Sequence, residues 1–273
     1  MKELFTRVMV AIVAIPLIAA IILYGKAPLV LFINILVCLG LWEYFRLCQI
    51  KIKMISQIVI LIQAVTTCWL VFYYGELALF YSIILAFGLL GLANIFRKDF
   101  VSATTRMVQM FYGFVYVSLF NFMILIRELE HVKYDDYLLG GYWILFMFAI
   151  IWICDTAAYF VGKTWGKVKF SPHVSPNKTI EGFIGGLIFG TLAAYIFSLF
   201  AFQEIPLFKL LIAGLLISLF GQFADLMESM FKRKAGAKDS STLIPGHGGV
   251  LDRFDSTLIG LPLLYFMLKY WMY

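Results

Sequence analysis

Long apolar runs separated by short polar segments fill most of this 273-residue chain. A helix needs about 20 apolar residues to cross the roughly 30 Å of hydrocarbon in a bilayer. With that window the sequence predicts about nine transmembrane helices, at residues 5–24, 27–47, 54–74, 76–95, 107–127, 138–161, 180–203, 205–229 and 257–272. Because backbone polar groups in lipid must find partners within the same structural element, we expect an all-α polytopic membrane protein.

The basic residues between these runs are distributed unevenly. If the N-terminus lies in the cytoplasm, 17 of the 22 Lys and Arg residues fall on the cytoplasmic side. Lys and Arg accumulate in the cytoplasmic loops of membrane proteins. The distribution therefore predicts a cytoplasmic N-terminus and, with nine spans, a C-terminus outside.

The composition excludes a soluble globular fold. Hydrophobic residues make up 63% of the chain and charged residues 14%, against about 45–50% and 25% in a soluble domain. The net charge of +6 is explained by membrane topology, so no nucleic-acid partner is predicted. The four cysteines have no C-x-x-C spacing, which indicates neither a disulfide framework nor a zinc site.

The two halves of the chain differ in the polar residues that they carry. Residues 1–130 have short connections and intramembrane positions filled with Leu, Ile, Val and Phe, which indicates mainly scaffold spans. Residues 150–256 carry polar groups at the ends of spans and two long loops. We find no internal repeat, so residues 1–273 are predicted to form a single membrane domain, with any chemistry in the second half.

Four polar residues share one face of the predicted span 205–229 and its extension. They are Asp225, Glu228, Ser229 and Lys232, spaced i, i+3, i+4 and i+7. Such spacing places side chains along one stripe of a helix. Carboxylates inside a membrane are costly and usually face a wet cavity or a partner. The stripe alone fits equally well a helix-end cluster in which both acids pair with Lys232.

The loop that follows this stripe combines cations with a glycine-rich turn. The cations are Arg233, Lys234 and Lys238, and the turn consists of Pro245, Gly246, His247, Gly248 and Gly249. Glycines let the backbone approach a ligand closely, and successive amides can bind an anion. Asp252, Arg253 and Asp255 come next, with the two aspartates three residues apart. Hard oxygen ligands beside cations and close backbone are what a magnesium–polyphosphate site needs.

This ordered motif resembles the signature of the bacterial phosphatidate cytidylyltransferase (CDP-diacylglycerol synthase) family. The matching residues are Ser229, Lys232, Arg233, Lys238, Asp239, the turn 245–249 and the run 251–256. Asp225 also fits the family, whereas Ala224 stands where many relatives have glycine. The signature covers about an eighth of the chain, and a second motif extends the resemblance over most of the C-terminal half.

The second motif lies at the ends of two neighbouring predicted spans. It runs from Asp155 to Lys163 and from Ser175 to Gly182. Ser175 before Pro176 predicts a helix N-terminus, and a helix N-terminus beside Lys178 is a natural phosphate seat. From the residues alone we prefer a simple interfacial pairing of Lys178 with Glu181. The resemblance favours the phosphate seat, because the same string recurs in the family.

The resemblance implies a Mg²⁺-dependent enzyme that transfers CMP from CTP to phosphatidic acid, giving CDP-diacylglycerol and pyrophosphate. It implies a multi-pass protein of the inner (cytoplasmic) membrane whose active site faces the cytoplasm. The expected metal ligands are Asp225, Asp252 and Asp255, with a second cation left open. These aspartates, Lys232 and Lys238 are the expected catalytic residues. The expected substrate-binding residues are Asp155, Lys178, Glu181, Ser229, Arg233, Gly246, His247, Gly248, Gly249 and Arg253.

Two other functions stay open at this point. One is a CTP-dependent polyprenol kinase, which would release CDP instead of pyrophosphate. The other is a transporter with a charged cavity on its cytoplasmic side, although the charges cluster near one membrane face.

A small-residue face also leaves two interpretations of assembly. Gly182, Gly186, Gly190 and Ala194 recur every four residues. Such a face permits close helix packing. We expect packing within one protomer, with a homodimer interface as the alternative.

Overall fold

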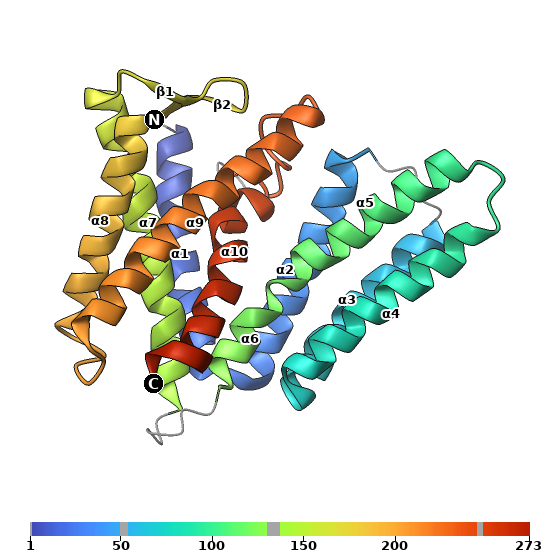
Figure 1. Cartoon of the computed structure of the whole chain (residues 1–273), viewed down its shortest axis with the longest axis horizontal. Helices are drawn as coiled ribbons and strands as arrows, with labels where there is room; N and C mark the ends of the chain where they lie inside the picture. The colour runs from blue at the N-terminus through green and yellow to red at the C-terminus, as the bar shows by residue number, and fades with distance from the viewer. Residues whose placement is uncertain (1, 50–53, 130–136, 245–247) are drawn as a thin grey trace.

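The computed structural model describes residues 2–49, 54–129, 137–244 and 248–273, with side chains from residue 9 onward (Figure 1). The helices are α1 (Lys2–Tyr24), α2 (Lys26–Leu47), α3 (Met54–Tyr74), α4 (Glu76–Ile95), α5 (Phe100–Ser118), α6 (Asn121–Arg127), α7 (Leu138–Trp165), α8 (Ile180–Ser198), α9 (Leu207–Lys234), α10 (Leu251–Met267) and the π-helix η1 (Leu268–Met272). Two short strands, β1 (Lys169–Ser171) and β2 (Ser175–Thr179), form an antiparallel hairpin.

Seven helical segments in the described part of the chain are long and apolar enough to cross a membrane. They are α2, α3, α4, α5 together with α6, α7, α8 and α9. The predicted all-α polytopic membrane architecture is therefore confirmed. The remaining two predicted spans correspond to α1, whose described apolar part is Met9–Tyr24, and to α10, which ends at Met267 and continues as η1.

One helix start follows a capping residue instead of the hydropathy of the span. The span predicted at 107–127 begins earlier, at Phe100, because the Asp99 side chain accepts a hydrogen bond from the Ser102 amide (3.2 Å). Such a cap satisfies an amide that has no partner within the helix. This segment is also broken between Ser118 and Asn121, so that α5 and α6 replace one continuous helix.

The predicted helix start at Ser175 and Pro176 is wrong. Both residues lie in β2, where Ser175 pairs with Ser171 and Thr179 pairs with Lys169. Proline is tolerated in an edge strand because its missing N–H is not needed there. Helix α8 begins four residues after Pro176, and Thr179 caps it by accepting a hydrogen bond from the Gly182 amide (3.1 Å).

The small-residue face of α8 packs within the chain, as expected. A Cβ at Gly182 would collide with the Ala158 carbonyl on α7, and a Cβ at Gly190 would collide with Ser218 on α9. Glycine at these two positions therefore lets α7, α8 and α9 approach closely. These three helices form one side of the molecule, with the hairpin across one end of it (Figure 1).

Helix α2 connects the two halves of the chain. It packs against α3 and α5 on one side and against α10 on the other. Its buried positions include Leu29, Val30, Ile33 and Leu41. Because α2 reaches α10, a residue of the N-terminal half can contact the C-terminal motif region.

A buried arginine joins elements at the end of the molecule away from the hairpin. Arg127, at the end of α6, is 1% exposed. Its Nε donates to the Ile22 carbonyl (2.7 Å) and its Nη2 donates to the Leu23 carbonyl (2.5 Å), near the end of α1. Its Nη1 donates to the Tyr137 carbonyl, just before α7. One guanidinium thus satisfies carbonyls from two separate segments.

Candidate active site

A cavity of about 750 Å³ lies among the hairpin, α7, α8, α9 and the start of α10. Its charged lining residues are Asp155, Lys163, Lys169, Lys178, Asp225, Lys232, Asp239, Asp252, Arg253 and Asp255. Acidic and basic side chains are equally numerous in this set. Such a lining can bind a cation and a polyanion together, because carboxylate oxygens attract the first and ammonium or guanidinium groups the second.

Lys178 and Asp225 bring the two sequence motifs together. The Lys178 Nζ lies 2.6 Å from the Asp225 Oδ2, joining β2 to α9. The Ser229 hydroxyl donates to the Asp225 Oδ1 at 3.3 Å. About 30% of the Asp225 side chain remains exposed. Asp225 therefore pairs across the tertiary structure instead of with Lys232 on its own helix.

Three aspartates approach the cavity from three different helices. Asp155 comes from α7, Asp225 from α9 and Asp255 from α10. The negative charge of Asp225 acts on both Asp155 and Asp255. Like charges held close together are unfavourable without a neutralising cation. In the described part of the chain, however, no three acidic, His or Cys side chains lie close enough together to hold a metal ion by themselves.

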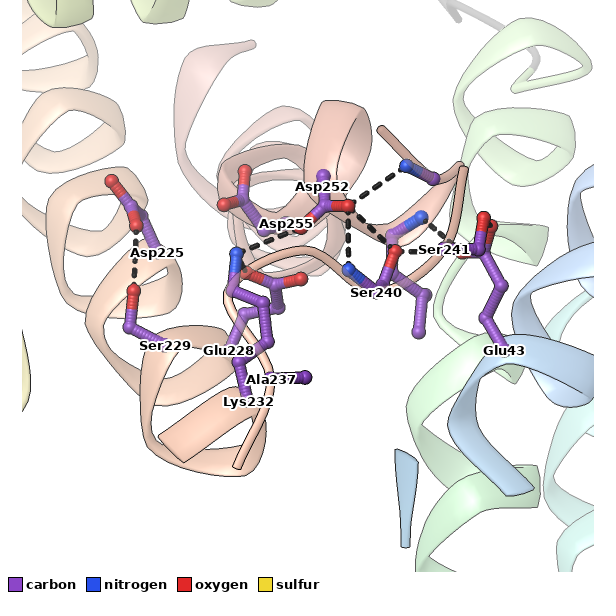
Figure 2. Close-up of polar contacts among 12 residues, drawn as sticks. Glu43, Asp225, Glu228, Ser229, Lys232, Ala237, Ser240, Ser241, Asp252 and Asp255 are labelled. Carbon is purple, nitrogen blue, oxygen red and sulfur yellow. Dashed lines mark hydrogen bonds and ion pairs between the residues drawn. The ribbon is translucent and has the colours of Figure 1, made fainter. Parts of the chain in front are cut away.

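Lys232 lies between two buried carboxylates. Its Nζ forms ion pairs with Glu228 on α9 and with the Asp252 Oδ1 on α10, the latter at 2.8 Å (Figure 2). The Glu228 and Asp252 side chains are 1% and 4% exposed. A buried charge is tolerated when it is paired and hydrogen-bonded. The pairing of Glu228 with Lys232 matches the helix-stripe interpretation, whereas Asp252 joins it from another helix.

The second oxygen of Asp252 is also fully engaged. Asp252 Oδ2 accepts from the Ser240 amide (2.7 Å), the Ser240 hydroxyl (2.8 Å) and the Gly249 amide (2.8 Å). Asp252 therefore holds the loop before α10 in place. Asp255, one helical turn later, lines the same cavity and interacts with the other aspartates. The first turn of α10 is helical, so the two residues share a face, as the spacing predicts.

The glycine-rich turn is described in part. Gly248 has a φ of +84°, and a Cβ there would meet the Asp252 carboxylate. Its carbonyl accepts a hydrogen bond from the Ile244 amide (2.8 Å). A left-handed φ and a close approach both favour glycine at this position. The predicted substrate-binding residues Gly246 and His247 lie outside the described residues.

Several predicted site residues do not line this cavity. Glu181 accepts a hydrogen bond from the Val168 amide (3.3 Å), next to the hairpin. Arg233 donates to the carbonyls of Val174 (3.2 Å) and Ala237 (3.1 Å). Lys238 lines a separate cavity of about 340 Å³. Glu181 and Arg233 thus form hydrogen bonds with segments beside the cavity. Ser229 donates a hydrogen bond to Asp225, which lines it.

The structure adds residues that were not among the expected site residues, although Lys163 and Asp239 belong to the two sequence motifs. Lys163, Lys169 and Asp239 line the main cavity. Lys163 has a sequence signal, because it lies two turns beyond Asp155 at the end of α7. Glu43, on α2, contacts Ser240 and Ser241 next to Asp252 (Figure 2). The sequence feature that could have identified Glu43 is a carboxylate inside a predicted transmembrane helix, because such residues usually have a partner or a function.

Known proteins resemble this chain over nearly its whole length. The cytidylyltransferase family model matches residues 5–271. A phosphatidate cytidylyltransferase of Bacillus subtilis (strain 168) is 34% identical, with 98% of each chain aligned. A phosphatidate cytidylyltransferase of Staphylococcus aureus (strain COL) is 37% identical, and one of Staphylococcus saprophyticus is 35% identical, each over 96% of this chain and 98% of the relative.

Proposed function

Because this chain belongs to the cytidylyltransferase family, we propose that it transfers CMP from CTP to phosphatidic acid. The products are CDP-diacylglycerol and pyrophosphate. The observation that carries this proposal is the cavity in which five aspartates and five basic residues gather. It can hold a triphosphate and a lipid phosphate side by side, and the names of the relatives identify the pair of substrates.

The proposed reaction is an in-line substitution at phosphorus. An oxygen of the lipid phosphate forms a bond to the α-phosphorus of CTP, and the bond from that phosphorus to the α–β bridging oxygen breaks. Pyrophosphate leaves with the electron pair. A phosphate monoester is largely ionised at neutral pH, so the attacking oxygen needs no strong general base. The protein then acts by positioning the substrates and neutralising their charge.

The basic residues of the cavity are assigned by their positions. Lys178 pairs with Asp225, and Arg253 on α10 acts electrostatically on Asp155; we assign both to the substrate phosphates. Lys163 and Lys169 line the same cavity from α7 and β1 and extend this positive surface. Lys232 keeps Asp252 in place through their 2.8 Å ion pair.

Magnesium fits the carboxylates that face the cavity. Mg²⁺ prefers oxygen ligands and is usually held by one or two carboxylates together with water and substrate phosphates. We assign it to Asp225 and Asp255, with Asp155 beside them. Because the described carboxylates form no group of three ligands, the remaining ligands would have to be water and substrate phosphates. Asp252, expected as a ligand from the sequence, would first have to give up a donor. A bound Mg²⁺ would neutralise part of the negative charge of the triphosphate.

The N-terminal end of α1 and the hairpin lie at the same end of the molecule, and the C-terminus lies at the opposite end (Figure 1). With the charge distribution of the loops, this arrangement supports a cavity that faces the cytoplasm, where CTP is available.

The test is product formation by the purified protein. Pyrophosphate and CDP-diacylglycerol are measured with CTP, phosphatidic acid and Mg²⁺, and with each component omitted in turn. We expect equal amounts of both products and a requirement for all three components. Release of CDP in place of pyrophosphate, or no reaction by a well-folded protein, would overturn the proposal.

A further inference from the structure

A completely buried carboxylate from the N-terminal half meets the candidate site. Glu43, near the end of α2, is 0% exposed. Burying a carboxylate without compensating hydrogen bonds costs several kcal/mol. Its environment should therefore explain why an acid is present there. Figure 2 shows its carboxylate directed at the segment that leads into α10.

Four neutral donors from this segment meet the Glu43 carboxylate. Ser241 Oγ (2.6 Å) and the Val250 amide (2.9 Å) donate to Oε1. Ser240 Oγ lies 3.1 Å from Oε2, and the Leu251 amide donates to Oε2 at 2.8 Å. Three of these groups donate to Glu43 alone, whereas the single proton of the Ser240 hydroxyl is shared between Glu43 and the nearer Asp252 Oδ2 (2.8 Å).

Two of these donors are the amides at the start of α10. First-turn amides have no acceptor within their own helix, and a side chain usually supplies one. The N-cap residue, Val250, has no polar side chain to do so. Glu43 supplies the acceptor from a different helix, and its negative charge complements the positive end of the α10 dipole.

Ser240 connects Glu43 to Asp252. Its hydroxyl lies 3.1 Å from Glu43 Oε2 and 2.8 Å from Asp252 Oδ2, and its amide also donates to Asp252. Ser241 contacts Glu43 through its hydroxyl. A Cβ at Gly249 would collide with Ser240 and Glu43, which explains why glycine occupies this motif position.

We propose that Glu43 is a positioning residue, which holds the loop before α10 so that Asp252 and Asp255 are correctly presented to the cavity. This inference rests on the proposed function for its kinetic consequence. A carboxylate is needed because all four groups facing it can donate hydrogen bonds. The amide nitrogen of a glutamine would face an N–H of Val250 or Leu251, leaving that donor without an acceptor.

The test compares E43Q, E43D, S240A and S241A in the full-length detergent-purified protein. E43Q should lower kcat at least about tenfold, with KM values for both substrates within about threefold, because the reacting geometry is disturbed more than substrate binding. E43D should recover part of the loss. S240A should lower kcat more than S241A, since Ser240 alone of the two also reaches Asp252. N34A, at another buried polar position of α2, controls for general disturbance of this helix.

Hydrogen exchange gives a readout that is independent of turnover. E43Q should speed exchange of the Val250 and Leu251 amides while the β1–β2 hairpin keeps its protection. If the wild type forms no CDP-lipid, the proposed function fails, and the exchange data still test the positioning role. Wild-type kcat and unchanged exchange in E43Q would overturn the inference. Equal kcat losses in S240A and S241A would also overturn it, and these small changes remain informative if E43Q does not fold.

Discussion

At the scale of single residues, two aspartates of one motif have different surroundings. Asp252 is fully occupied by Lys232, Ser240 and Gly249, whereas Asp255 lies next to other carboxylates. Both were predicted from the sequence to be metal ligands. The hydrogen bonds of Asp252 make it a structural part of the loop, and the like charges around Asp255 make it the better candidate for direct contact with a cation.

This difference predicts different outcomes for the two asparagine variants. D255N should reduce turnover at least about a hundredfold without lowering the melting temperature, because it removes a repelling charge from the cavity. D252N should reduce turnover and also lower the melting temperature, because its amide nitrogen would face Lys232 or the N–H donors. Melting curves and pyrophosphate release measure both effects. Equal melting temperatures for the two variants would contradict the assignment.

At the scale of secondary-structure elements, hydropathy predicted the helices well in their middles and less well at their ends. The spans predicted at 54–74 and 76–95 coincide with α3 and α4. The start of α5 was missed because Asp99 caps it. The span predicted at 180–203 begins where α8 begins, whereas the helix start predicted from Ser175 and Pro176 was wrong because these residues pair with β1. Apolar length is a local property, whereas caps and strand pairs depend on specific hydrogen bonds.

The Thr179 cap gives the element-scale prediction. T179A removes the acceptor for the Gly182 amide (3.1 Å) and should lower the free energy of unfolding by about 1 kcal/mol. Because Thr179 lies next to Lys178, the KM for a substrate should rise as well. T179S keeps the hydroxyl and serves as the control. Unfolding monitored by circular dichroism in detergent measures the first effect, and a T179A protein as stable as T179S would refute the role of the cap.

At the scale of the whole molecule, contacts between residues far apart in the sequence join the helices. Hydropathy predicts each helix separately and gives no information on these contacts. Glu43 connects α2 to α10 at the candidate site, and Arg127 connects α6 to α1. The expectation that residues 1–130 are mainly scaffold did not anticipate a buried acid from this half beside the motif. Glu43 lies in a run whose hydrophobic pattern is that of an ordinary span.

Arg127 gives the prediction at this scale. R127K can replace one of the hydrogen bonds to the carbonyls of Ile22, Leu23 and Tyr137 and leaves others unmade. Each unsatisfied buried acceptor costs about 1–3 kcal/mol, so the melting temperature should fall clearly. The kcat of the folded protein should stay near wild type, because Arg127 lies far from the cavity. R97K, in the loop before α5, is the matched control and should melt like the wild type.

The amino-acid sequence was enough to predict the membrane architecture, the family and the motif segments that meet around the candidate cavity. These depend on the length of apolar runs and on motifs whose residues are close in the chain. The pairing of Lys178 with Asp225, the hydrogen bonds that hold Asp252 to the loop, and the contact of Glu43 with the start of α10 became visible only in the packed structure. These contacts join positions far apart in the sequence, and no local pattern encodes them because the partners meet only when the helices pack.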